Sequence, residues 1–234
     1  MENLKLLNTE SSILSPPREL VQDWIIKIDI LRYSLELIEN QYELLFSNLE
    51  NKVNGLDLNT FKKNPILLDY AWSIIEKSHG LFQLIRKLIP EYSFENKILW
   101  DSIRLIRNTQ QHLDERLDLF NITDHPFLGY LSIIFKNVSN NNDKNMFLLG
   151  GYSLRNLNFG TTDIKYFKYK DFKSVRLNSI DRGRNKHSID LIELFLELKT
   201  FIYFLERKID LTMEKNNFEK YDWTQFRDIT VLLN

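Results

Sequence analysis

The chain has 234 residues, of which 43% are hydrophobic and 27% are charged, a composition that indicates one folded globular domain and excludes wholesale disorder. Its 31 basic and 32 acidic side chains nearly cancel, so bulk charge gives no reason to expect indiscriminate binding to nucleic acid. The absence of cysteine excludes disulfides, cysteine-ligated metal sites and thiol catalysis. Because no secretory signal and no run of about 18 apolar residues stands out, we expect a cytoplasmic protein with no membrane contact.

Three long helices are predicted in the first half of the chain. Ser15, which precedes two prolines, suits the N-cap of the first helix, and Asn54-Gly55 ends it. In between, apolar residues recur at alternating steps of four and three and form one stripe: Trp24, Ile28, Leu31, Leu35, Ile38, Tyr42, Leu45 and Leu49. Such a stripe suits either a long antiparallel bundle or a coiled-coil-like dimer seam.

The second and third helices are predicted from similar signals. The second begins at Asn64-Pro65 and stops before Pro90. The third runs from about Phe94 to Leu119, and its core side carries Leu99, Ile103, Ile106, Leu113 and Leu117.

From Phe127 to about Ile180 the pattern changes to β-prone segments separated by turns. Strands are predicted within residues 130–138 and 164–169, with a polar loop over 139–145. Helical periodicity returns after Ser188, and a short final helix is expected over 222–233. We therefore predict a single, mainly α domain with helical parts at about 16–123 and 186–210 and a small antiparallel β insert at about 127–180.

Polar side chains line the third predicted helix opposite its core side: Arg104, Asn108, Gln111, His112 and Glu115. Arg107 lies on the flank, five residues before His112, which is about 140° around the helix axis. Several turns of polar groups on one side of a helix need either water or another macromolecule against them.

The segment Arg107-Asn108, followed by three residues and His112, resembles the Arg-x(4–6)-His signature of the HEPN superfamily, in which a polar residue often follows the arginine. The resemblance implies an up-down helical bundle that pairs as a homodimer, with the two motifs meeting at the dimer axis. It also implies a metal-independent endoribonuclease of toxin–antitoxin or antiviral-defence type, with RNA as substrate, no cofactor, and a possible cognate antitoxin or other partner protein. Other members of the superfamily lack activity and bind nucleotides or partners.

The residue types of this segment suit RNA cleavage. Histidine titrates near neutrality and can accept or donate a proton, and arginine offers a fork of donors to phosphate oxygens. Arg107, Asn108 and His112 are therefore the predicted catalytic residues, with Arg104 and Gln111 as predicted RNA contacts.

A second predicted RNA-binding region is locally basic. Residues 165–186 carry eight basic and two acidic side chains, which is 8 − 2 = +6, interleaved with aromatic residues: Lys165, Lys168, Lys170, Lys173, Arg176, Arg182, Arg184 and Lys186. Such a strip suits contact with an RNA backbone. The alternative is that the lysines protect exposed edge strands from aggregation while the aromatic residues pack the sheet onto the bundle.

Two less specific interpretations stay open. The polar face of the third helix can be an ordinary solvated surface, and the chain can be a non-catalytic helical module that binds a partner protein or nucleotide. The nuclease hypothesis requires Arg107, Asn108 and His112 to be exposed in a cleft or two-fold groove. The module hypothesis is favoured if Arg107 is held in intramolecular pairs. No metal site is expected from the four histidines, and His79 is interpreted as a packing or surface residue.

Overall fold

The structure, a computed structural model, describes residues 5–54, 64–112, 129–136, 143–149, 172–181, 183 and 185–220. Within these residues the elements follow one another along the chain as α1 (Gln22–Asn54), α2 (Asn64–Leu88), α3 (Lys97–Gln111), β1 (Tyr130–Lys136), β2 (Asp143–Leu149), β3 (Phe172–Ile180), β4 (Lys186–Asp190) and α5 (Leu191–Asn216). The prediction of a mainly helical chain with a small antiparallel sheet is confirmed.

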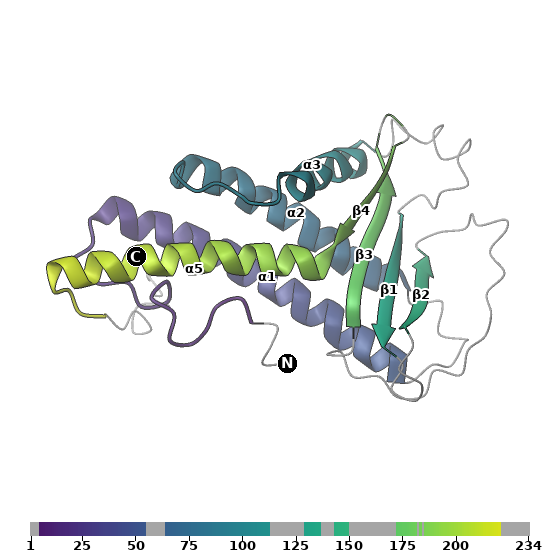
Figure 1. Cartoon of the computed structure of the whole chain (residues 1–234), viewed down its shortest axis with the longest axis horizontal. Coiled ribbons are helices and arrows are strands. Elements are labelled where there is room, and N and C mark those ends of the chain that lie inside the picture. Colours follow the sequence, from purple (N-terminus) through teal and green to yellow (C-terminus); the bar gives the residue numbers. More distant parts are fainter. Residues whose placement is uncertain are drawn as a thin grey trace, which may run out of the picture.

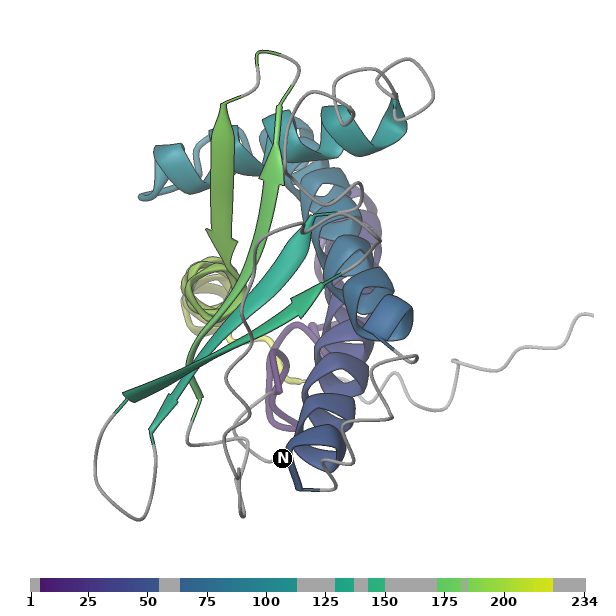
Figure 2. The same cartoon turned by 90° about the vertical axis from the view of Figure 1, so that its right-hand side faces the viewer.

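The helices α1, α2 and α5 run along the long axis of the molecule, and the sheet lies at the end where α5 begins (Figure 1). The views in Figures 1 and 2 agree that α2 lies between α1 and α3, with α3 close to the β3–β4 part of the sheet. Among the helices that the structure describes, none is both long and apolar enough for a membrane span.

The predicted apolar stripe of the first helix is confirmed. From Ile28 to Leu49 its members are at most 1% exposed, and only Trp24, at the start of the helix, is half-buried. The stripe faces the interior of the protomer: the hydroxyl of Tyr42 donates to the carbonyl of Leu191 in α5 at 2.8 Å, and its ring makes an edge contact with Phe195. This stripe therefore serves the bundle, not a dimer seam.

The predicted start of the first helix is wrong. The helix begins at Gln22, seven residues after Ser15. The backbone N–H of Leu20 donates to the carbonyl of Pro17 at 3.2 Å, and this turn buries the Leu20 side chain before the helix starts. Burial of an apolar residue has outweighed the local preference for a cap followed by proline.

The second helix agrees with its prediction, whereas the third differs at its start. α3 begins at Lys97, where the Asn96 side chain caps the helix by accepting from the Leu99 N–H at 3.0 Å. Its buried residues are Leu99, Trp100, Ile103, Ile106 and Thr109. The described part of the helix ends at Gln111, and Leu113, Leu117 and the rest of 113–128 lie outside the described residues.

The sheet has the strand order β2-β1-β3-β4, and every neighbouring pair is antiparallel. Residues that face one another across strands β1, β3 and β4 supply its buried face: Leu131 opposite Leu177, Ile133 opposite Val175, and Leu177 opposite Ile189. Gly129, just before β1, has φ of 75°, and a side chain there would meet the Asn178 carbonyl oxygen at 2.2 Å. Only glycine therefore fits this entry into the sheet.

Three predicted boundaries in the second half of the chain need correction. Residues 186–190, predicted as helical, form strand β4, because the Asp190 side chain accepts from the Ile192 N–H at 2.9 Å and so starts the helix at Leu191. α5 continues to Asn216, beyond the predicted end at 210. Residues 143–145, predicted as loop, belong to β2. The predicted strand at 164–169 and the predicted helix at 222–233 lie outside the described residues.

Candidate functional site: the α2–α3 face

Polar and charged side chains from α2 and α3 gather on one surface, which we call the α2–α3 face: Glu76, His79, Gln83, Arg104 and Arg107. The three α2 residues are spaced i, i+3 and i+7, which places them on one side of that helix. The two arginines are three residues apart on α3, so they also share a side.

Arg107 is held by an ion pair with Glu76. Its Nε lies 3.3 Å from both carboxylate oxygens, and its Nη2 lies 3.2 Å from Oε1. The two side chains are 26% and 45% exposed, and an ion pair with that much access to water contributes only about 0–1 kcal/mol. The ion pair therefore orients the guanidinium. Replacing the carboxylate with another anion would cost little free energy.

His79 lies beside this ion pair and is half-buried. Burial is the largest influence that lowers the pKa of its imidazole, the positive charges of Arg107 and Arg104 lower it further, and Glu76 opposes them. Its Nε2 lies 3.5 Å from the Gln83 side-chain nitrogen. The imidazole therefore holds a proton less readily than a free histidine side chain does.

Arg104 is the accessible cation of the face. Its side chain is 56% exposed, and its ion pair with Asp101, one turn earlier on the same helix, is long at 3.5 Å. Asn108 and Gln111 follow it at steps of four and three residues and are also exposed. The predicted RNA contacts Arg104 and Gln111 thus lie where a ligand can reach them.

The predicted helix to Leu119 would place His112 in the middle of a polar helical face. The structure instead places His112 at the end of α3. It is the C-cap residue of α3, with φ −118° and ψ 34°, and its side chain is exposed. The helical geometry that relates it to Arg107 and Asn108 therefore ends at this residue. The structure gives Arg107 hydrogen bonds to Glu76, and its positive charge acts on His79; both residues belong to α2.

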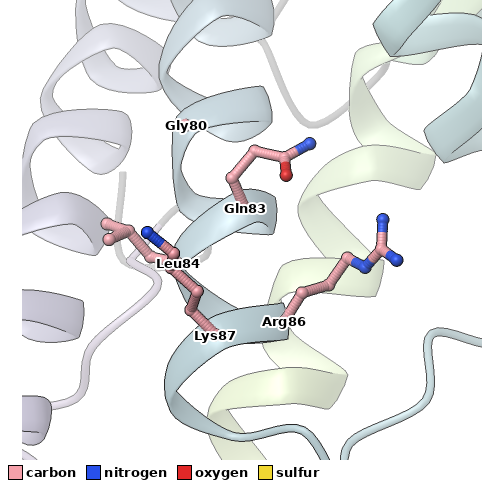
Figure 3. Close-up of a pocket in the computed structure, with 5 residues that line it drawn as sticks. All are labelled: Gly80, Gln83, Leu84, Arg86 and Lys87. Carbon is pink, nitrogen blue, oxygen red and sulfur yellow. The ribbon is translucent and has the colours of Figure 1, made fainter.

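An open pocket of about 520 Å³ extends the face along α2. It is lined by Gly80, Gln83, Leu84, Arg86 and Lys87. Figure 3 shows Gln83 and Arg86 pointing to one side of the helix and Leu84 and Lys87 to the other. A Cβ atom at Gly80 would meet nothing within 4 Å, so packing within the chain does not require glycine there. The helix backbone at Gly80 is therefore exposed beside the cationic side chains of Arg86 and Lys87.

Sequence reasoning missed Glu76 and His79 as members of the site. Their spacing with Gln83 along one side of α2 was a usable signal, because it set polar residues apart from the apolar stripe of that helix. What joins them to Arg107 is a contact between residues 31 positions apart in sequence, and periodicity within one helix does not predict such a contact.

The predicted basic strip is only partly described. Lys165, Lys168, Lys170, Arg182 and Arg184 lie outside the described residues. Lys173, Arg176 and Lys186 are exposed, and Arg176 Nε lies 3.4 Å from a carboxylate oxygen of Asp190. Phe172 is buried against Phe46 of α1, with ring centroids 6.1 Å apart.

These positions bear on the two roles predicted for the basic strip, which are contact with RNA and protection of exposed edge strands. β3 lies between β1 and β4, and Arg176 pairs with Asp190 of β4, so protection of an edge strand is the wrong explanation for Arg176. Among the described basic residues of the strip, Lys173 lies beyond the part of β3 that pairs with β4, and Lys186 lies on the edge strand β4. The packing role expected for the aromatic residues is confirmed for Phe172. A base cannot stack on that ring while it is buried.

A second polar cluster closes the turn between β3 and β4. His187 Nε2 lies 2.8 Å from Asp181, and Asn185 donates to the same carboxylate from its backbone and side-chain nitrogens. Burial alone would raise the pKa of Asp181, but the hydrogen bonds from His187 and Asn185 hold it below its usual value. These contacts tie the turn together. In the part of the chain that the structure describes, no group of three or more His, Asp or Glu side chains is arranged to hold a metal ion.

Comparison with known proteins gives no further assignment, because no family model, no curated protein and no solved structure matches the chain.

Proposed function

We propose that this chain is a HEPN-like protein that binds the phosphate backbone of RNA through the α2–α3 face. The observation that carries the proposal is the presence of two arginines and a half-buried histidine on one surface. The resemblance of residues 107–112 to the HEPN signature supports RNA as the ligand. The protein has almost no net charge, so binding by a local cluster is the form of RNA recognition that its electrostatics allow.

The Glu76–Arg107 ion pair supports a mechanism in which a phosphate of RNA replaces Glu76 at Arg107. A carboxylate and a phosphate offer the same fork of acceptor oxygens to a guanidinium. In the absence of RNA, Glu76 keeps the Arg107 side chain extended along the face. A phosphate then replaces Glu76, while Arg104 and the cations beside Gly80 contact neighbouring phosphates.

A single chain favours binding over cleavage, because it supplies only one His112, whereas cleavage needs both a proton acceptor and a proton donor. Within the chain Arg107 is paired with Glu76. An intramolecular pair at Arg107 is the arrangement that favours the module hypothesis. Catalysis by Arg107, Asn108 and His112 at a homodimer interface, in a toxin or antiviral-defence protein with a cognate antitoxin, stays a prediction from the resemblance.

Binding is tested by fluorescence anisotropy with a labelled single-stranded RNA at fixed salt. Arg104→Ala should weaken binding about tenfold, since a charge-assisted hydrogen bond contributes about 1.5 kcal/mol or more. Glu76→Gln should strengthen binding, because it releases Arg107 and removes a negative charge. Arg207→Ala, which removes an exposed arginine from α5, is the matched control and should have no effect. Equal loss in Arg104→Ala and Arg207→Ala would show that binding is not located on this face.

Cleavage is tested in parallel on total RNA in the presence of EDTA. We expect no cutting by the isolated chain. Cutting that persists in EDTA and is lost in both His112→Ala and Arg107→Ala would replace the binding proposal with the endoribonuclease that the resemblance implies.

A further inference from the structure

Arg86 extends the row of α2 side chains that belongs to the α2–α3 face. The members of this row follow one another at steps of three, four and three residues: Glu76, His79, Gln83 and Arg86. This spacing keeps them on one side of the helix over about 15 Å. Figure 3 shows Gln83 and Arg86 pointing to the same side of α2. One end of the face is therefore formed by an amide and a guanidinium.

Arg86 lies over an aromatic stack that reaches into the protein interior. Its guanidinium carbon is 5.7 Å from the ring centroid of Phe82, four residues earlier on the same helix. The Phe82 ring in turn stacks on Trp100 of α3, with the two centroids 4.8 Å apart and the ring planes at 14°. Trp100 is buried, whereas Arg86 is exposed. The stack is therefore fixed by packing at its inner end and presents a guanidinium at the surface.

Arg86 differs from the two arginines of α3 in its partners. Those two arginines form ion pairs with Glu76 and Asp101. Among the residues that the structure describes, no carboxylate forms an ion pair with Arg86. A guanidinium that is held by a ring and not by a carboxylate keeps its N–H donors and the outer side of its planar group accessible to a ligand.

The chemistry at this end of the face suits a nucleobase. Unpaired bases of RNA stack on aromatic rings and on the planes of arginine guanidinium groups. The amide of Gln83 carries both a donor and an acceptor, which the edge of a base can use, whereas a phosphate offers acceptors only. Gln83 and Arg86 line the open pocket beside Gly80, where the absence of a side chain leaves room for a flat ring.

We propose that the guanidinium of Arg86 stacks on an unpaired base of the bound RNA and that Gln83 contacts the edge of that base. The inference rests on the proposed function, and it adds a base-binding subsite to a face that otherwise contacts phosphates. Stacking uses only the planar side of the guanidinium, so its N–H edge stays available to a neighbouring phosphate.

Two labelled strands of equal length separate base binding from phosphate binding. One is a short oligouridylate, and the other has the same number of phosphates but is built from abasic nucleotides. In fluorescence anisotropy at fixed salt, the unchanged protein should bind the oligouridylate about tenfold more tightly, which is the gain expected from one stacked base. Arg86→Lys keeps the positive charge but lacks the planar group, so it should bind the two strands equally.

Lys87→Ala is the matched control, because it removes a charge from the next residue of the same helix and leaves the stack intact. It should weaken binding of both strands by the same factor and keep the tenfold ratio. A tenfold ratio that persists in Arg86→Lys, or equal binding of the two strands by the unchanged protein, would overturn the inference. In either case, weaker RNA binding by Arg104→Ala would still support the proposed function. If the unchanged protein bound neither strand, the proposed function would be overturned and the inference with it.

Discussion

Arg107 and His79 are the two residues on which the α2–α3 face depends. Burial is the main influence that lowers the pKa of His79, and the positive charge of Arg107 lowers it further. A phosphate that displaces Glu76 takes over the opposing negative charge of that carboxylate, and a second phosphate at Arg104 adds negative charge that stabilises the imidazolium. The face is thus expected to take up a proton when it binds a phosphate.

A pH dependence of RNA binding follows from His79. In the free chain its pKa lies below the ordinary value of about 6.5, and a bound phosphate raises it. Affinity should therefore increase as pH falls from about 8 to 6. The measurement is anisotropy at several pH values with unchanged protein and His79→Gln. The same slope in both would show that His79 is not the group that takes up the proton.

Gly80 gives a second prediction at this scale. Gly80→Ala should raise the free energy of unfolding by about 0.5–1 kcal/mol, since alanine is the better helix former and its methyl group meets no atom within 4 Å. If RNA approaches the bare backbone beside Lys87, the same variant should bind RNA more weakly. Urea denaturation and anisotropy measure the two effects. A variant that is more stable and binds unchanged would show that this pocket is not used.

At the scale of elements, Tyr42 joins α1 to the start of α5. It is fully buried, its hydroxyl donates to the Leu191 carbonyl, and burial followed by the charge of Asp190 raises the pKa of its phenol well above the usual value. The carbonyl belongs to the residue at which strand β4 becomes a helix. One hydrogen bond therefore fixes the sheet end of α5 against the middle of α1.

Tyr42→Phe should lower the free energy of unfolding by about 0.5–1.5 kcal/mol, because it removes a buried hydrogen bond between α1 and α5. Urea denaturation checks this as a shift in midpoint with an unchanged slope. Tyr203→Phe, at an exposed tyrosine, is the control and should change stability by less than about 0.5 kcal/mol. A Tyr42→Phe variant as stable as the control would show that this hydrogen bond does not hold the two elements together.

The sequence predicts α1 and α2 well because their apolar periodicity repeats over many turns. It fails for β4, because five strand residues lead directly into a helix and the helical periodicity that follows was extended backwards over them. It places Arg104 and Arg107 on the site but not Glu76 and His79 of α2, since a contact between helices leaves no periodic trace in either.

At the scale of the molecule, the α2–α3 face lies on the side of α2 away from α1 (Figures 1 and 2). The face is cationic and polar and suits an anion. Because the chain has almost no net charge, RNA binding in this account depends on the local charge of that face.

The most direct test of the central claim is photo-crosslinking of RNA that contains 4-thiouridine, followed by mass spectrometry of the linked peptides. We predict that crosslinks fall within residues 76–88 and 100–112 and that they are reduced in Arg104→Ala but not in Arg207→Ala. Crosslinks that fall instead on the strand residues around Lys173, Arg176 and Lys186 would contradict the account and move RNA binding from the α2–α3 face to the sheet.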